Sequence, residues 1–158
     1  MKVFLSTLIG KIIATFFVSM LPIVELRAGL PFGISLGLNY YQALVAAVLG
    51  NMLPVPFIIL LIRKIFSLLR RISPWFESRI SALEKRADGK SELVNKYGAI
   101  GLFILVAIPL PGTGAWMGSL VAAMLGMRLK NAVPSILAGV LTAAAIMTGI
   151  TYGVIHFI

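Results

Sequence analysis

Long stretches without a charged residue constrain this chain more than any other feature of its sequence. Asp, Glu, Lys and Arg are all absent from residues 28–62, 97–127 and 131–158. Residues 3–24 are also uncharged, apart from Lys11. A helix needs about 20 apolar residues to cross the hydrocarbon core of a bilayer, and each stretch is long enough in principle. The chain is therefore expected to be an all-α integral membrane protein.

The overall composition excludes other classes of protein. Apolar residues make up 59% of the chain and charged residues 12%, whereas a soluble domain carries about 25% charged residues. A soluble fold of this size would expose large apolar patches, so a soluble enzyme is excluded. Disorder is excluded because it needs low hydrophobicity. Nucleic-acid binding is not expected despite the net charge of +9, because the cations flank apolar segments instead of forming a patch with stacking aromatics.

Most of the charged residues lie in one segment, 63–96. It holds nine of the fourteen basic residues and four of the five acids. The positive-inside rule places such a segment in the cytoplasm, here at the plasma membrane of a prokaryote. Ser73 and Pro74 are typical of a helix start, and Gly89 is typical of a helix end. We expect an amphipathic linker helix on the inner membrane surface; a solvated linker helix is the alternative.

Two parts of the chain, 1–62 and 97–158, repeat the same pattern of prolines and glycines on either side of the basic linker. The spacing of small residues in the first part, including the glycines at every fourth position from Gly29, recurs in the second. Such a self-match predicts two structural repeats. The matching positions are Leu21-Pro22 and Leu110-Pro111, Gly29 and Gly118, Leu36-Gly37 and Leu125-Gly126, Gln42-Ala43 and Asn131-Ala132, and Gly50 and Gly139.

Each repeat is expected to combine a broken helical segment with one transmembrane helix. In the second repeat, prolines and a glycine at 109–112 separate two apolar arms that are each too short for a core of about 30 Å. Residues 97–127 are either one kinked span or a re-entrant hairpin. The hairpin is favoured because it returns the following cations, Arg128 and Lys130, to the cytoplasmic face.

The first repeat shows the same organisation, so each repeat crosses the membrane once. The two repeats must then be inverted relative to each other, as in many secondary transporters. Broken backbone is tolerated in a membrane only where protein or a water-filled cavity surrounds it, so the hairpin tips are expected to face each other. The predicted elements are a hairpin at 4–38, a transmembrane helix at 40–62, a hairpin at 97–127 and a transmembrane helix at 131–158.

Glu25 and Arg27 lie at the break of the first hairpin and form the acid–base pair outside the linker. A charge at the bilayer centre costs at least ~2.5–3.5 kcal/mol, so such residues are functional candidates. Glu25 would carry a proton or hold a cation. Arg27 would bind an anionic headgroup, since guanidinium matches phosphate geometry. The alternative is a mutually neutralised pair that only fixes the tip.

The break of the second hairpin carries no charge but exposes its backbone. Pro109 and Pro111 end the incoming helix. Gly112 and Gly114 permit close backbone approach, and Thr113 would cap the restarting helix. The amides at that helix start would attract an anion or a carbonyl oxygen. A tight turn without a ligand is the alternative.

Trp116 and Asn51 are further candidates for the site. Trp116 would line a cavity between the two tips; the alternative is an ordinary aromatic residue that packs against its neighbours. Asn51 lies mid-span before Pro54 and Pro56, where it would bond a neighbouring helix or carbonyls freed by a kink. The chain has no cysteine, no cluster with metal-ligand spacing and no enzyme motif. No metal, cofactor or catalytic activity is therefore expected.

Both tips also resemble the signatures of a known family. Residues 22–31 (PIVELRAGLP) resemble the first signature of the small multi-drug export proteins, and residues 109–120 (PLPGTGAWMGSL) resemble the second. The family is similar in layout to the DedA superfamily. The resemblance implies paired re-entrant hairpins that move lipids or lipid carriers with proton coupling, and it adds Pro22 and Pro31 to the candidate site.

The predicted function is that of a membrane secondary transporter or exporter, in the form of a proton-coupled flippase of a lipid or lipid-linked anionic carrier. Its substrate and ion site would lie where the two tips meet at the bilayer midplane. A passive channel or scramblase and a non-transporting membrane assembly factor are the alternatives. The expected partners are the lipid bilayer, a small amphiphilic or lipid-phosphate substrate, protons or cations, and a second copy of the chain in a homodimer.

Overall fold

The computed structural model describes residues 7–110 and 112–157, with side chains as far as Gly149. All regular elements in this part of the chain are α-helices, which confirms the all-α prediction for these residues. The helices are α2 (Leu8–Met20), α3 (Glu25–Ser35), α4 (Tyr40–Met52), α5 (Pro54–Ile72), α6 (Pro74–Ala107), α7 (Ala115–Met124) and α8 (Leu129–Phe157).

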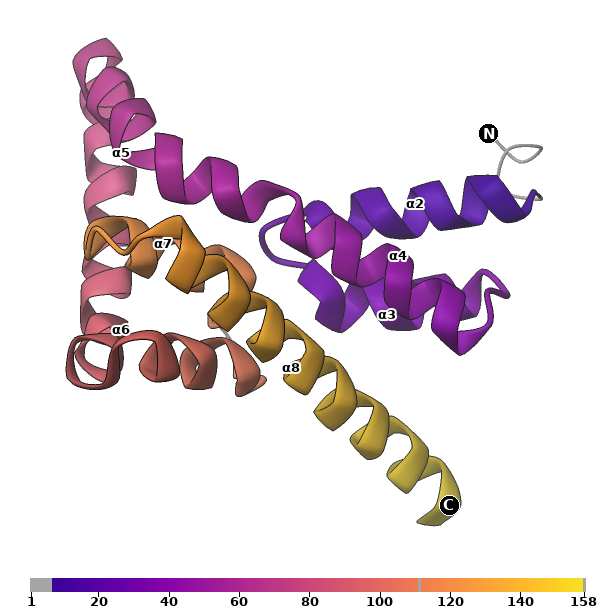
Figure 1. Ribbon diagram of the computed structural model, residues 1–158. Helices are drawn as coiled ribbons and strands as arrows, with labels where there is room; N and C mark the ends of the chain where they lie inside the picture. Colours follow the sequence, from indigo (N-terminus) through magenta and orange to yellow (C-terminus); the bar gives the residue numbers. More distant parts are fainter. Residues whose placement is uncertain (1–6, 111, 158) are drawn as a thin grey trace.

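Helices α2 and α3 form an antiparallel pair that is joined by a short turn (Figure 1). Thr15 and Ser19 of α2 are fully buried and face Gly33 and Gly29 of α3. Both hydroxyls donate to a carbonyl one turn back in α2, each over 2.8 Å, so neither is left without a partner in the contact. A Cβ on Gly33 would lie 2.8 Å from the Thr15 side chain. The small residues therefore allow the two helices to pack closely.

Helices α4 and α5 follow each other almost without a break and are interrupted at Leu53. The next residue, Pro54, has no amide hydrogen with which to continue the helical ladder. In the described residues, Tyr40–Ile72 and Leu129–Gly149 are the helices long and apolar enough to cross a membrane, and each contains an apolar 18-residue window, with mean hydropathies of 2.4 and 1.7. They begin at or next to the starts of the predicted transmembrane helices.

The first of these helices is longer than the predicted segment 40–62. Helix α5 continues to Ile72, ten residues into the predicted linker. No proline or glycine lies between Pro56 and Ser73, and Ile65, Leu68 and Ile72 keep apolar side chains at helical spacing. The prediction placed the end at the first cation, but a basic residue does not end a helix.

Helix α6 begins at Pro74, and the Ser73 hydroxyl accepts a hydrogen bond from the Trp75 amide at 3.3 Å. The predicted helix end at Gly89 is wrong, because the helix runs through this residue. Its buried face continues with Ser91 and Val94, so packing outweighs the low helix propensity of glycine. The backbone instead breaks at Gly98, where φ is +58°, and the apolar arm that follows runs in a new direction (Figure 1).

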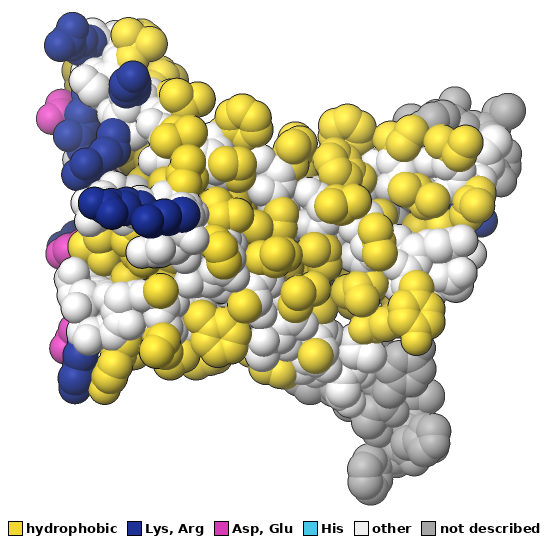
Figure 2. Space-filling view, viewed as in Figure 1, with side chains coloured by type: hydrophobic (Ala, Val, Ile, Leu, Met, Phe, Trp, Pro, Cys, Tyr) yellow, Lys and Arg dark blue, Asp and Glu magenta, His cyan; other side chains and the backbone are white. Residues whose placement is uncertain are grey.

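Basic side chains gather at one end of the molecule (Figure 2). Arg70 of α5 forms an ion pair with Glu84 of α6 at this end. Arg63 of α5 donates to the carbonyl of Met124, the last residue of α7, at 3.1 Å. Apolar side chains cover much of the remaining visible face (Figure 2). A surface this apolar is suited to lipid, so the structure supports a membrane location.

Helices α3 and α7 end in the same way. Gly37 and Gly126 have φ values of +83° and +64°, the left-handed conformation that glycine adopts at helix ends. The amide of the next residue bonds back to a carbonyl in the last turn, from Leu38 to Gly33 at 3.2 Å and from Met127 to Ala122 at 2.9 Å. These ends occupy matching positions in the two predicted repeats.

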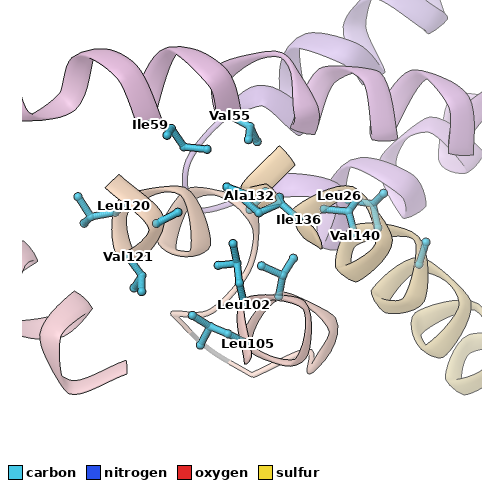
Figure 3. Close-up of a cluster of buried hydrophobic side chains, with 14 of the residues drawn as sticks. Leu26, Val55, Ile59, Leu102, Leu105, Leu120, Val121, Ala132, Ile136 and Val140 are labelled. Atoms are coloured by element: carbon cyan, nitrogen blue, oxygen red, sulfur yellow. The ribbon is translucent and has the colours of Figure 1, made fainter. Parts of the chain in front are cut away.

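A core of apolar side chains joins α7 and the apolar arm of α6 to α5 and α8 (Figure 3). Val106 from the apolar arm of α6 lies between Gly118 of α7 and Gly139 of α8. A Cβ on these glycines would lie 2.6 and 2.7 Å from the Val106 side chain. The three helices therefore pack around one valine, and this packing positions the turn between α6 and α7.

Candidate functional site

The turn that follows α2 and the turn that precedes α7 meet near the centre of the molecule (Figure 1). Arg27 of α3 reaches into the second turn. Its Nη1 donates to the carbonyl of Leu110 at 2.5 Å, and its Nη2 donates to the carbonyl of Ile108 at 3.2 Å. Nη2 also donates to the Thr113 hydroxyl at 2.7 Å. Ile108 is the C-cap residue of α6, so Arg27 places a positive charge at the C-terminal end of this arm, where the helix dipole favours it.

Glu25 makes the reciprocal contact with the start of α7. It is 5% exposed, and its Oε1 accepts a hydrogen bond from the Trp116 amide at 3.1 Å. A helix N-terminus attracts negative charge, so the anion predicted to bind there is supplied by the chain's own carboxylate. Glu25 also has a φ of +49°, a strained value for a residue other than glycine.

Glu25 and Arg27 form no direct ion pair of the kind that the alternative interpretation, a mutually neutralised pair, would favour. Both lie in the described part of the chain, and no ion pair joins them there. Each side chain instead bonds the opposite hairpin, Glu25 at the first turn of α7 and Arg27 at the end of α6. The reason is geometric, because the second break places a helix C-terminus beside Arg27 and a helix N-terminus beside Glu25, and each end attracts the opposite charge.

Gly114 lies directly against the Glu25 carboxylate. Its φ is +114°, and a Cβ at this position would lie 2.0 Å from Oε2 of Glu25. The predicted need for close backbone approach is therefore met by Gly114. Gly112 also has a positive φ, +72°, but no atom within 4 Å of a Cβ placed there. It serves the turn and not a contact.

Thr113 and Trp116 belong to the junction in roles that the sequence did not predict. Gly114 occupies the N-cap position of α7 and has no side chain, so the side chain that bonds the first turn of this helix is that of Glu25. The Thr113 hydroxyl is instead directed at Arg27 and at the Leu110 carbonyl, 2.7 Å from each. The Trp116 ring nitrogen donates to the carbonyl of Met20, the last residue of α2, at 3.1 Å. Trp116 therefore joins the hairpins.

Asn51 of α4 approaches the junction from the transmembrane segment. It is 2% exposed, and its Oδ1 has no hydrogen-bond partner. Asn51 lines a small cavity of about 10 Å³ beside Glu25 and Arg27. Oδ1 therefore accepts no bond from a neighbouring helix, which was one of the two predicted roles. The other lining residues are Leu26, Val106, Gly114, Ala115, Val140 and Ala143.

The predicted prolines are only partly brought to the junction. Pro109 lies between the two residues whose carbonyls bond Arg27, so it shapes that turn. Pro22 is exposed in the turn after α2. Pro31 lies within α3 and lines a separate pocket of about 230 Å³ with Tyr40 and Thr148, away from the junction. Pro111 lies outside the described residues.

Several contributors to the junction were missed by sequence reasoning. The carbonyls of Met20, Ile108 and Leu110 accept its key hydrogen bonds, and backbone groups leave no composition signal. Val140 and Ala143 of α8 line the cavity. They lie three residues apart on one helix face, but nothing in the apolar sequence of α8 marks that face as special.

The comparison with known families identifies the group to which this architecture belongs. Residues 25–146 match the family model described as Putative small multi-drug export protein. No curated protein and no solved structure matches the chain. The matched region begins at Glu25 and includes Arg27, Asn51 and the whole second hairpin, so it contains nearly every contact of the junction. The chain belongs to the small multi-drug export protein family.

Proposed function

We propose that the chain is a proton-coupled secondary transporter, an exporter or flippase of small amphiphilic or lipid-linked anionic substrates, and not an enzyme. One observation carries this proposal. Glu25, the single acid outside the basic segment, is buried where the two hairpins bond each other. An ionisable residue in such a place is a functional candidate by default.

Proton binding by Glu25 would change the contact between the hairpins. The ionised carboxylate accepts a charge-assisted bond from the Trp116 amide, and the neutral acid is a weaker acceptor. Uptake of a proton would therefore loosen the attachment of α3 to α7 and favour a second arrangement of the tips. A proton that binds the two arrangements with different affinity shifts their populations, which is the requirement for coupling.

The lengths of the hairpin helices support a re-entrant architecture. Helices α2, α3 and α7 have 13, 11 and 10 residues, which is about 15–20 Å and too short for a core of about 30 Å. The hairpins point toward each other from opposite ends of the molecule (Figure 1). We infer two re-entrant hairpins in inverted repeats, as in the DedA superfamily, with their tips at the midplane.

The distribution of charge supports one orientation. The basic end formed by α5 and α6 would lie in the cytoplasm, at the plasma membrane of a prokaryote. Lipid, or a second copy of the chain in a homodimer, would cover the apolar surface. Arg27 and the turn around Gly112 and Thr113 would receive the anionic group of the substrate when the tips separate.

The inverted arrangement predicts the sides on which two loops are labelled. Single cysteines at Asn39, before α4, and at Lys130, at the start of α8, are expected to react from opposite sides of the membrane. The chain has no native cysteine, so each variant carries one reactive thiol. A membrane-impermeant maleimide added to intact and to permeabilised cells measures the side. Labelling of both positions from the same side would contradict the inverted architecture.

The variant Glu25→Gln tests the coupling. The glutamine side chain keeps an oxygen for the Trp116 amide, so we expect the protein to fold with a loss of stability of only about 1 kcal/mol. In proteoliposomes with an imposed pH gradient, transport of ethidium and of a fluorescent anionic phospholipid is expected to fall at least about tenfold and to lose its response to pH. The measurement is the rate at which the fluorescence of each probe falls.

The variant Glu92→Gln is the control, because Glu92 is an exposed acid of α6. A non-transporting assembly factor is the second candidate function, and it is favoured by the fact that Glu25 and Arg27 already bond within the chain. It predicts no protein-dependent transport in wild type. Transport that is present but equally fast and independent of pH in wild type and Glu25→Gln would identify a passive channel or scramblase.

A further inference from the structure

A buried polar atom without a partner lies beside the hairpin junction. Among the buried side-chain nitrogens and oxygens of the described residues, Asn51 Oδ1 is the one atom without a hydrogen-bond partner. Leaving a buried acceptor unbonded costs about 1–3 kcal/mol. Such an atom in a native fold is therefore expected to meet a donor that the chain's own bonds do not supply.

The cavity next to Asn51 suits one small donor. Its volume of about 10 Å³ is close to the space needed by a single water molecule. A buried water needs two to four polar partners, and three polar side chains, Glu25, Arg27 and Asn51, line this cavity. A hydrated metal ion is too large for it. A bare cation would be repelled by the Arg27 guanidinium in the same wall.

We propose that one water molecule binds between Asn51 and Glu25, with Asn51 Oδ1 as its acceptor, and that this water sets how readily Glu25 takes up a proton. When Glu25 is ionised, the water donates one hydrogen to Asn51 Oδ1 and the other to the carboxylate. When Glu25 takes up a proton, its O–H donates to the water oxygen, and the water still donates to Asn51. Asn51 is thus a positioning residue that holds the water against Glu25 in both protonation states, whereas the charge of Arg27 excludes metal cations.

This inference deepens the proposed function and rests on it only in that Glu25 exchanges protons. Arg27 is the charged side chain that faces the cavity with Glu25. The residues that α4, α6, α7 and α8 contribute to the lining do not titrate. A change of protonation at the cavity therefore belongs to Glu25.

Infrared difference spectroscopy of the full chain in liposomes, recorded between pH steps, measures this protonation without any substrate. The carbonyl band of the neutral Glu25 acid is assigned by its loss in Glu25→Gln. Asn51→Leu removes the acceptor that holds the water, so the ionised carboxylate loses a charge-assisted donor and the neutral acid loses a weaker bond. At a given pH the ratio of protonated to ionised Glu25 is therefore expected to rise by up to about tenfold, the worth of one hydrogen bond. A water O–H band that shifts in H₂¹⁸O is expected to disappear in the same variant.

Asn51→Asp and Asn95→Leu complete the test. Asn51→Asp keeps an acceptor oxygen and adds a carboxyl that shares a proton with Glu25, so the protonated ratio is expected to rise. Asn95→Leu alters an exposed asparagine of α6 and is expected to leave the band unchanged. If Asn51→Leu does not fold, the water O–H band of the wild-type protein decides the question: a band that shifts in H₂¹⁸O and responds to the Glu25→Gln substitution supports the inference, and its absence overturns it.

An unchanged Glu25 titration in Asn51→Leu, or a fall of the protonated ratio in Asn51→Asp, would overturn the inference. A shift of the titration when sodium replaces choline at equal ionic strength would also overturn it, because the site would then bind a metal cation. Failure of the proposed function is distinguishable: the Asn51-dependent band would persist while ethidium and phospholipid transport stayed at the level of empty liposomes.

Discussion

Replacement of Gly114 by alanine is expected to separate the two hairpin tips and to abolish transport. The new Cβ would lie 2.0 Å from Oε2 and 2.7 Å from Cδ of Glu25, so the carboxylate must leave the Trp116 amide. That bond is of the charge-assisted kind, worth about 1.5–3 kcal/mol. The backbone φ of +114° adds about 1–3 kcal/mol of strain for a residue with a Cβ.

Together these two effects predict a loss of about 4 kcal/mol of stability for Gly114→Ala, measured by thermal unfolding in detergent and accompanied by transport at background level in proteoliposomes. Gly126→Ala is the matched control. Gly126 also has a positive φ, +64°, but nothing within 4 Å of a Cβ, so the expected cost is about 1 kcal/mol of left-handed strain. Equal melting temperatures for the two variants would show that the contact with Glu25 contributes nothing.

Replacement of Arg27 by alanine is expected to have a similarly large effect from the other side of the junction. The carbonyls of Ile108 and Leu110 would lose the guanidinium that bonds them. The buried carboxylate of Glu25 would also lose its nearest positive charge. Arg27 makes three charge-assisted hydrogen bonds, and each bond of this kind is worth about 1.5–3 kcal/mol, so we expect a loss of about 4 kcal/mol or more. Thermal unfolding and the transport assays described above measure the two consequences.

Arg27→Lys separates charge from geometry. Lysine keeps the charge, but its single ammonium cannot present the planar fork that reaches two carbonyls and a hydroxyl, so we expect it to recover less than half of the lost stability. Arg79→Ala is the control, because this exposed arginine lies 5.3 Å from the Trp75 ring centre and contributes at most about 1 kcal/mol. A loss in Arg27→Ala no greater than in Arg79→Ala would argue against a role in joining the hairpins.

Both predictions follow from how few bonds hold the tips together. The hydrogen bonds recorded across the junction come from Glu25, Arg27 and Trp116, and each ends on a backbone group or a hydroxyl of the opposite hairpin. Such contacts depend on charge and orientation more than on buried apolar area. A change at one of these few side chains is therefore expected to alter the attachment more than it would alter a close-packed interface.

Much of the fold was predictable because its signals are local. Charge-free stretches predicted membrane helices, and the two candidate spans begin at Tyr40 and Leu129, at or next to the predicted starts. The position of the second break was also predictable, because Pro109 cannot continue a helix through its missing amide hydrogen. Periodicity and helix-breaking residues act within a few positions of the chain, so they can be read without knowing the fold.

Predictions failed where the packing of buried side chains, or a competing hydrogen-bond partner, decided the outcome. Gly89 was expected to end a helix, but buried neighbours carry α6 through it to Gly98. Thr113 was expected to cap α7, but its hydroxyl bonds Arg27 instead. In both cases a local preference worth about 1 kcal/mol or less was outweighed by contacts from a distant part of the chain.

The sequence by itself determined that the chain is a helical membrane protein with two broken segments, one acid–base pair at the first break and a basic end. Only the tertiary structure decided that Glu25 bonds the start of α7, that Arg27 bonds the end of α6, and that Asn51 shares their cavity. The physical reason is that these contacts join residues more than 20 positions apart, and most of them more than 80. Their partners are set by how two hairpins dock around small residues, and no local pattern encodes that docking.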